Sequence, residues 1–160
     1  MRTPTLIVAM IAMMAAPAFA EDLTLEDVRA MSDDELYALA ETLSSEDEAR
    51  LYQQARKEFP SKALGLQAAR NELEKSVAEL DACRSALESD KPSELRALQE
   101  LEPGRYLSLL RIVAEPSSEV MDMTTDERVT DAKAVGRETN SVLRDFRDCK
   151  RKYRKRFGDD

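Results

Sequence analysis

The stretch LQAARNELEKSVAELDACRSAL, residues 66–87, places a leucine at every seventh position. A small residue follows three positions after each of the first three leucines, and the last of these is Cys83. Residues spaced alternately three and four apart form a continuous stripe along one face of an α-helix. The stripe consists of Leu66, Ala69, Leu73, Ser76, Leu80, Cys83 and Leu87, with Val77 beside it. We therefore predict a long helix over about residues 61–89 that packs lengthwise against a second helix.

A second stripe with the same spacing occurs near the end of the chain. It consists of Ala132, Val135, Thr139, Val142, Phe146, Cys149 and Tyr153. This stripe predicts a second long helix over about residues 125–156. The chain between the two helices is long enough to turn back, so we expect an antiparallel pair. Each stripe carries one of the two cysteines, so facing stripes would bring the thiols together in the seam.

The rest of the chain is also expected to be helical. Alanine, leucine, glutamate, lysine and arginine dominate it, and these residues favour helices. Capping residues followed by acidic residues mark four helix starts, at Thr24, Ser32, Ser45 and Thr124, and prolines mark boundaries at Pro60, Pro92, Pro103 and Pro116. Shorter helices are predicted near residues 25–31, 33–43, 46–59, 93–101 and 104–115. The predicted fold class is an all-α helical bundle built on two long antiparallel helices with shorter flanking helices.

The first residues have the pattern of a secretory signal peptide. Arg2 gives a positive start, residues 6–16 are uninterrupted apolar residues, and small residues precede a cleavage point after Ala20. The apolar run is shorter than the about 20 residues of a membrane-spanning helix, which disfavours an uncleaved anchor. We therefore expect a periplasmic or secreted chain with no transmembrane helix. Residues 21–160 would form a single helical domain, with acidic short helices over 21–59 and a disulfide-stapled core over 61–156.

Export bears on the two cysteines. In an oxidising compartment two cysteines are usually paired, and the one intramolecular pairing is Cys83–Cys149. Six of the seven residues after Cys149 are Lys or Arg, and such cations can activate a thiol by lowering its pKa. A reactive thiol usually has a basic or resolving partner, however, and the chain has no histidine and no C-x-x-C motif. We expect a structural disulfide, with a reactive thiol and an intermolecular disulfide as the alternatives.

Few residue patterns point to catalysis or to metal binding. The absence of histidine removes the commonest general base and the usual catalytic zinc ligand, and no glycine-rich phosphate loop is present. Carboxylates cluster at helix starts, where negative charge complements the helix dipole. The stretch DMTTDERVTD, residues 122–131, offers oxygen ligands but lacks the glycine and the spacing of an EF-hand loop. We predict no catalytic residue, no metal site and no cofactor.

The charge distribution is asymmetric. Residues 21–48 contain eleven acidic residues and one basic residue, whereas residues 144–156 contain eight basic and two acidic residues. The basic end either binds an anionic partner, such as lipid headgroups, cell-wall polymer or an acidic protein, or attracts the acidic end, or simply complements the helix dipole. The candidate contacts with an anionic partner are Lys150, Arg151, Lys152, Arg154, Lys155 and Arg156. Export and a net charge of −8 argue against nucleic acid as the partner.

The stretch RYLSLLRIVAEP, residues 105–116, is the most apolar part of the chain after the first twenty residues. A helix that is apolar over most of its circumference is normally central in a core, and we expect that here. The alternative is an apolar docking surface formed by Leu107, Ile112 and the two methionines of the next loop, Met121 and Met123.

These features predict a non-enzymatic binding or structural protein of the cell envelope that acts through its surfaces and charged ends. The alternative is an inhibitor or accessory subunit of an exported enzyme, which would insert the irregular stretch EPSSEVMDMTTDE, residues 115–127, into a cleft. A less favoured alternative is a carboxylate-based hydrolase, with two acids about 5–10 Å apart across a groove. The leucine repeat also permits pairing between subunits, so a homo-oligomer is left open.

Overall fold

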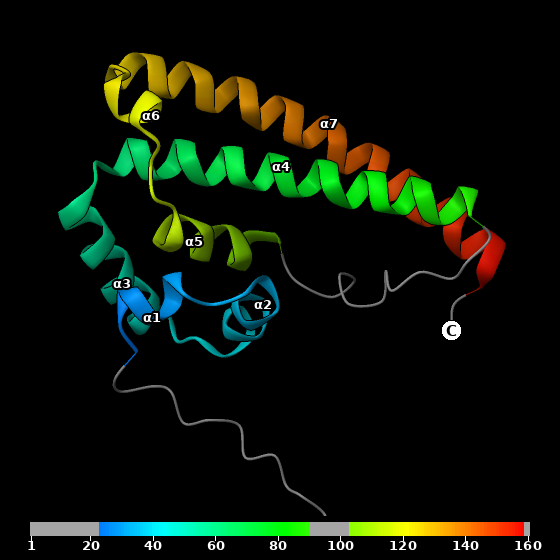
Figure 1. Cartoon of the computed structure of the whole chain (residues 1–160), viewed down its shortest axis with the longest axis horizontal. Coiled ribbons are helices and arrows are strands. Elements are labelled where there is room, and N and C mark those ends of the chain that lie inside the picture. Colours follow the sequence, from blue (N-terminus) through cyan, green and yellow to red (C-terminus); the bar gives the residue numbers. More distant parts are fainter. Residues whose placement is uncertain (1–22, 90–102, 159–160) are drawn as a thin grey trace, which may run out of the picture.

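The computed structural model describes residues 23–89 and 103–158, and within them the fold is all-α (Figure 1). The helices are α1 (Leu25–Arg29), α2 (Asp33–Thr42), α3 (Ser45–Glu58), α4 (Ser61–Glu88), α5 (Pro103–Val113), α6 (Ser118–Asp122) and α7 (Thr125–Phe157). The all-α prediction and the two long helices are therefore confirmed. The predicted signal peptide and the helix predicted near residues 93–101 lie outside the described residues.

Side-chain caps define most of the helix starts. Three of the predicted starts have a complete capping box, in which the hydroxyl accepts a hydrogen bond from the third helical N–H and the acidic side chain there accepts one in return. These three N-caps are Thr24, Ser32 and Thr124. The start of α3 differs from the prediction, because Ser44 rather than Ser45 is its N-cap and accepts from the N–H of Asp47. At the other end of the chain, α7 stops at Gly158, whose φ of 84° favours glycine.

The two long helices lie side by side and run in the same direction (Figure 1). In the first half of each helix, Arg70 of α4 donates a hydrogen bond to Asp131 of α7 at 2.8 Å. Near their last turns, the disulfide between Cys83 and Cys149 joins them. The antiparallel orientation predicted from the sequence is therefore wrong, and α4 and α7 form a parallel pair.

The parallel arrangement arises because α5 provides the return leg of the chain. Lys75 in the middle of α4 donates a hydrogen bond to the Tyr106 hydroxyl near the start of α5. The backbone N–H of Ser117, which follows α5, donates to Gln67 closer to the start of α4. Thus α5 runs antiparallel to α4 and brings the chain back to the first turns of α4, where α7 begins.

The predicted stripes form the seam between α4 and α7. All fourteen members are buried or half-buried. The two cysteines are 66 positions apart in the sequence, and the same offset relates Leu80 to Phe146, which pack in the same apolar cluster as the disulfide. Val77, predicted to lie beside the stripe, is 39% exposed and lies outside the seam.

A larger apolar cluster joins α1, α2, α3 and α5 to the first half of α4. Its fully buried members include Val28, Leu51, Leu64 and Ile112, one from each of four helices. Most of the predicted apolar helix over residues 105–116 is buried here, which confirms its place in the core. Burial of apolar area on this scale is the main driving force for docking the short helices onto α4.

The stretch 115–127 is not the irregular loop that the sequence suggested, because it contains α6. Val120 of α6 is fully buried beside Leu66 and Val135, in a third apolar cluster between the first halves of α4 and α7. Arg128 of α7 donates hydrogen bonds to the carbonyls of Val120 and Met121. The segment is therefore part of the packed structure.

Candidate functional site

The disulfide settles the question of the two thiols. Cys83 and Cys149 are bonded, with 6.3 Å between their Cα atoms, and both side chains are buried. Phe146 packs beside them, and Tyr153 is half-buried against the same cluster. Cys149 therefore faces the seam although six cationic residues follow closely. The expected pairing is confirmed.

The six cationic residues 150–156 form a group that we call the basic tip, defined as Lys150, Arg151, Lys152, Arg154, Lys155 and Arg156. All except Lys150 are exposed. Arg151 pairs with Asp148 one helical turn earlier, at 3.0 Å, and Arg156 donates a hydrogen bond to the carbonyl of Leu87 at the end of α4. The tip therefore lies against the end of α4 and presents most of its charge to solvent.

Lys150 differs from its neighbours in the tip because it is half-buried. Its amine lies 5.4 Å from the centroid of the Phe146 ring. Burial, and after it the positive charge of Arg154, holds the pKa of the Lys150 amine below its ordinary value. Lys150 thus packs partly against the α4–α7 seam. The side chains of the tip that are exposed to solvent belong to the residues that follow it.

A polar cluster that sequence reasoning missed lies where α2 and α5 meet the middle of α4. The rings of Tyr37 and Tyr106 stack in parallel, with centroids 4.4 Å apart. The Lys75 amine lies 4.0 Å from the first centroid and 4.4 Å from the second, and it donates to the Tyr106 hydroxyl at 2.9 Å. Asp33 lies 3.6 Å from the same amine. Burial, followed by nearby carboxylates, raises the pKa of both phenols, so both stay protonated.

Two half-buried glutamates on α4 also escaped sequence reasoning. Burial raises the pKa of Glu79, and Lys75 together with a hydrogen bond from Tyr37 opposes that rise. Burial likewise raises the pKa of Glu72, opposed by Arg111. Neither side chain lines either of the hollows described below. Neither of these two hollows therefore contains the pair of facing carboxylates that a carboxylate-based hydrolase would need.

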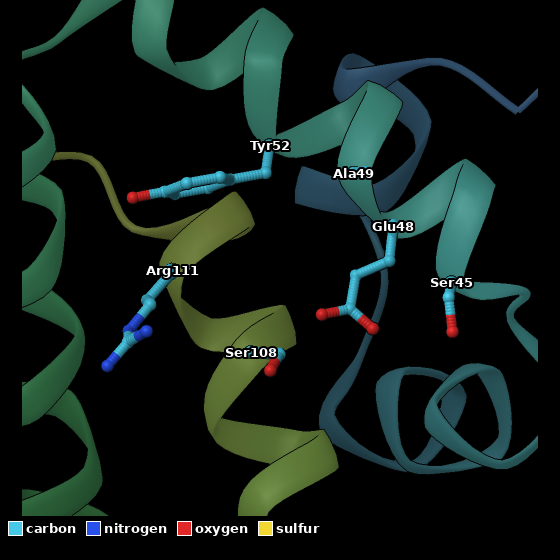
Figure 2. Close-up of a pocket in the computed structure, with 6 residues that line it drawn as sticks. All are labelled: Ser45, Glu48, Ala49, Tyr52, Ser108 and Arg111. Atoms are coloured by element: carbon cyan, nitrogen blue, oxygen red, sulfur yellow. The ribbon is translucent and has the colours of Figure 1, made fainter.

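A hollow of about 300 Å³ lies between α3 and α5 (Figure 2). Glu48 and Ser45 come from α3, Ser108 comes from α5, and Tyr52 and Arg111 lie at the end nearer α4. Figure 2 shows the Tyr52 hydroxyl and the Arg111 guanidinium both pointing toward α4.

Tyr52 and Arg111 also line a larger hollow of about 460 Å³, which we call the basic groove. Its other walls come from α4 and α7 and include Lys62, Arg128 and Lys133. Its described lining residues include four basic side chains and no carboxylate, although the whole chain has a net charge of −8. No pattern in the sequence indicated this groove, because its residues come together from four different helices.

The residues considered for an apolar docking surface do not form one continuous patch. Ile112 is fully buried and Met123 is half-buried against the third cluster, whereas Met121 is 37% exposed. Leu107 of α5 packs against the larger cluster instead. The structure thus assigns Ile112 to the core and separates Leu107 from the two methionines.

Two broader features bear on the kind of site. No set of three His, Cys, Asp or Glu residues within the described ranges is grouped closely enough to hold a metal ion. None of the described helices has the length and apolarity needed to cross a membrane.

No family model matches this chain, and neither the curated proteins nor the solved structures include a similar one.

Proposed function

We propose that the protein is an exported, non-enzymatic binding protein that engages an anionic component of the cell envelope through the basic tip. The observation that carries this proposal is the placement of the tip. Five of its cations are exposed at the end of the α4–α7 pair that lies away from α3 (Figure 1). Each Lys or Arg held near an anionic surface contributes about 1 kcal/mol of attraction, so a cluster of this kind can bind without an apolar anchor.

The acidic residues of α2 and α3 that form ion pairs within the described residues pair with bases outside the tip. Acidic residues of α2 and α3 lie beside other bases, since Asp33 faces Lys75, Asp47 faces Arg50 and Glu58 faces Arg29. Among the described residues, no ion pair joins α1, α2 or α3 to the basic tip. Lys152 and Lys155, both exposed, are therefore the tip residues whose replacement tests contact with an anionic partner.

The scaffold keeps the tip in one orientation. The disulfide joins α7 to α4 close to the tip, and Arg156 is bonded to the last turn of α4 through the Leu87 carbonyl. A preorganised cation cluster loses less conformational entropy on binding than a free tail would. The disulfide also supports export, because such bonds persist in oxidising compartments.

The proposal is tested by co-sedimentation with vesicles and by retention on immobilised polyglutamate. The disulfide-bonded protein is mixed with phosphatidylglycerol-containing vesicles and with pure phosphatidylcholine vesicles, at low and at high salt. We expect retention by at least one anionic matrix, no retention on phosphatidylcholine, and loss of retention as salt rises. Vesicles and polyglutamate distinguish a lipid surface from an acidic polymer or protein.

Matched variants assign any retention to the tip. Lys152→Gln combined with Lys155→Gln should weaken binding severalfold, because it removes two exposed charges of the tip. Lys57→Gln combined with Arg137→Gln removes the same charge from exposed positions elsewhere and should leave binding nearly unchanged. Retention by neither anionic matrix, or equal weakening by the two double variants, would contradict the proposal.

A further inference from the structure

The side chain of Arg128 is buried and positively charged, and no negative group within the described residues pairs with it. It is 7% exposed, and its Nε–H and Nη2–H donate to the carbonyls of Val120 and Met121 at 2.8 and 2.7 Å. These bonds fix the guanidinium against the end of α6, but both acceptors are neutral. Buried charges in proteins are normally paired with an opposite charge, so this arginine differs from that pattern.

Arg128 lines the basic groove, and the two lysines of the groove also lack an ion pair among the described residues. Lys62 comes from the first turn of α4 and Lys133 from α7. Neither lysine has an ion pair with a carboxylate of the described residues. The first turn of α4 strengthens the positive field, because it carries no acidic residue and Pro60 provides no side-chain cap. The groove therefore concentrates positive charge inside a molecule that is acidic overall.

The remaining walls of the basic groove are mainly apolar. Leu66, Ala69, Val129 and Ala132 lie along α4 and α7, and the ring of Tyr52 closes the side toward α3. The volume of about 460 Å³ falls within the range of small-molecule sites. A ligand that matches both kinds of wall has one anionic head and a short apolar body.

We propose that the basic groove is a binding site for a small amphipathic anion, with a carboxylate or phosphate head near Arg128, Lys62 and Lys133 and an apolar chain along α4 and α7. The head supplies the negative charge that Arg128 lacks. The apolar chain covers the partly exposed side chains of Ala69, Val129 and Ala132. This site is separate from the basic tip, and it stands whether or not the tip binds an envelope component.

The test is a titration of the full disulfide-bonded chain with defined probes, followed by amide chemical shifts. The probes are octanoate and octyl phosphate, with octan-1-ol as the neutral control and acetate as the head-group control. We expect saturable shifts in residues 62–69 and 128–133 with an apparent Kd below about 1 mM for at least one of the two octyl anions. Comparison of the two anions tells which head the site prefers. Octanol and acetate should bind at least about tenfold more weakly, because octanol lacks the anionic head and acetate lacks the apolar chain.

Variants that lose the same amount of charge distinguish specific binding in the groove from nonspecific attraction of the anions to the protein. Lys62→Gln combined with Lys133→Gln should weaken octyl-anion binding by about tenfold or more, whereas Lys152→Gln combined with Lys155→Gln in the tip should change it little. Arg128→Met should abolish binding, but it also removes the bonds to α6, so the lysine variants decide the outcome. The proposal is overturned if neither anion saturates below about 1 mM, if octanol binds equally well, or if the two lysine variants behave alike.

Discussion

Cys83 and Cys149 occupy equivalent heptad positions on two parallel helices, with their Cα atoms 6.3 Å apart. The disulfide between them closes a loop over a sequence separation of 66 residues. It lies in the last turns of the pair, where Leu80 and Phe146 also pack. This bond therefore both constrains the unfolded chain and holds the end of α7 on α4.

We predict that reduction lowers the free energy of unfolding by about 4 kcal/mol, the chain-entropy value for a loop of this length. Urea denaturation with and without reductant measures the change. A Cys83→Ser, Cys149→Ser double variant should match the reduced protein and be insensitive to reductant. Equal unfolding midpoints in the two states would argue against the assigned role.

The sequence predicted which residues form the seam between α4 and α7, but not the relative orientation of the two helices. A heptad stripe on each helix looks the same for parallel and antiparallel neighbours, so the stripes alone leave the orientation open. The orientation depends on the path of the connection, and α5 uses that connection to return along α4. One signal did exist: the two cysteines hold the same place in their heptads, which suits parallel helices packed in register.

The candidate site was predicted in part. The basic tip could be located from the density of Lys and Arg after Cys149, because such a run sits on one helix. The basic groove and the Tyr37–Tyr106 stack could not, because each combines side chains from several helices whose packing is set by tertiary contacts. The pair Lys75 and Glu79, four residues apart on α4, was the one local hint.

Replacing Lys75 with methionine tests the polar cluster. The amine lies close to two stacked rings and donates to Tyr106, and the side chain is only 19% exposed. We expect Lys75→Met to lower the free energy of unfolding by about 1–2 kcal/mol. Lys57→Met, on the exposed surface of α3, should stay within about 0.5 kcal/mol of the parent protein. Urea denaturation compares them, and similar effects would show that the cluster contributes little.

Truncation of Ile112 tests its assignment to the core rather than to a docking surface. Ile112 is fully buried in the larger cluster, whereas Met121 is 37% exposed. We expect Ile112→Ala to cost about 2–5 kcal/mol because it leaves a cavity. Met121→Ala should change stability by less than about 0.5 kcal/mol. Thermal or urea unfolding provides the measurement. A loss of stability for Ile112→Ala as small as that for Met121→Ala would contradict the assignment of Ile112 to the core and favour the docking surface.

The start of α7 offers a test of capping. The Thr124 hydroxyl accepts from the backbone N–H of Glu127, and the Glu127 carboxylate accepts from the N–H of Thr124. We expect Thr124→Ala to lower the free energy of unfolding by about 1 kcal/mol. Thr130→Ala, at an exposed position one turn into the helix, is the control and should not destabilise the protein. Equal losses in the two variants would contradict the capping assignment.

The raised pKa of Glu79 determines the direction in which the free energy of unfolding changes with pH at this site. Its neighbours are Tyr37 and Asp33 from α2, Lys75 on its own helix and Lys150 from α7. Burial outweighs the favourable partners, so the pKa of Glu79 in the folded protein lies above the ordinary value of 4.5. The folded state then binds more protons than the unfolded state between these two pKa values. Stability contributed by protonated Glu79 is present below pH 4.5 and is lost as the pH rises through the folded-state pKa.

Glu79→Gln should therefore increase the free energy of unfolding at pH 7, because glutamine keeps an acceptor for Tyr37 and removes the cost of a buried charge. The gain should shrink as the pH falls below the folded-state pKa and disappear below 4.5, where both proteins are neutral at this position. Glu74→Gln, at an exposed position on the same helix, is the control and should show no such gain. Urea denaturation between pH 3 and pH 8 measures the difference. A variant that is less stable at pH 7 would mean that the attraction between Glu79 and Lys75 outweighs burial, contrary to the raised pKa.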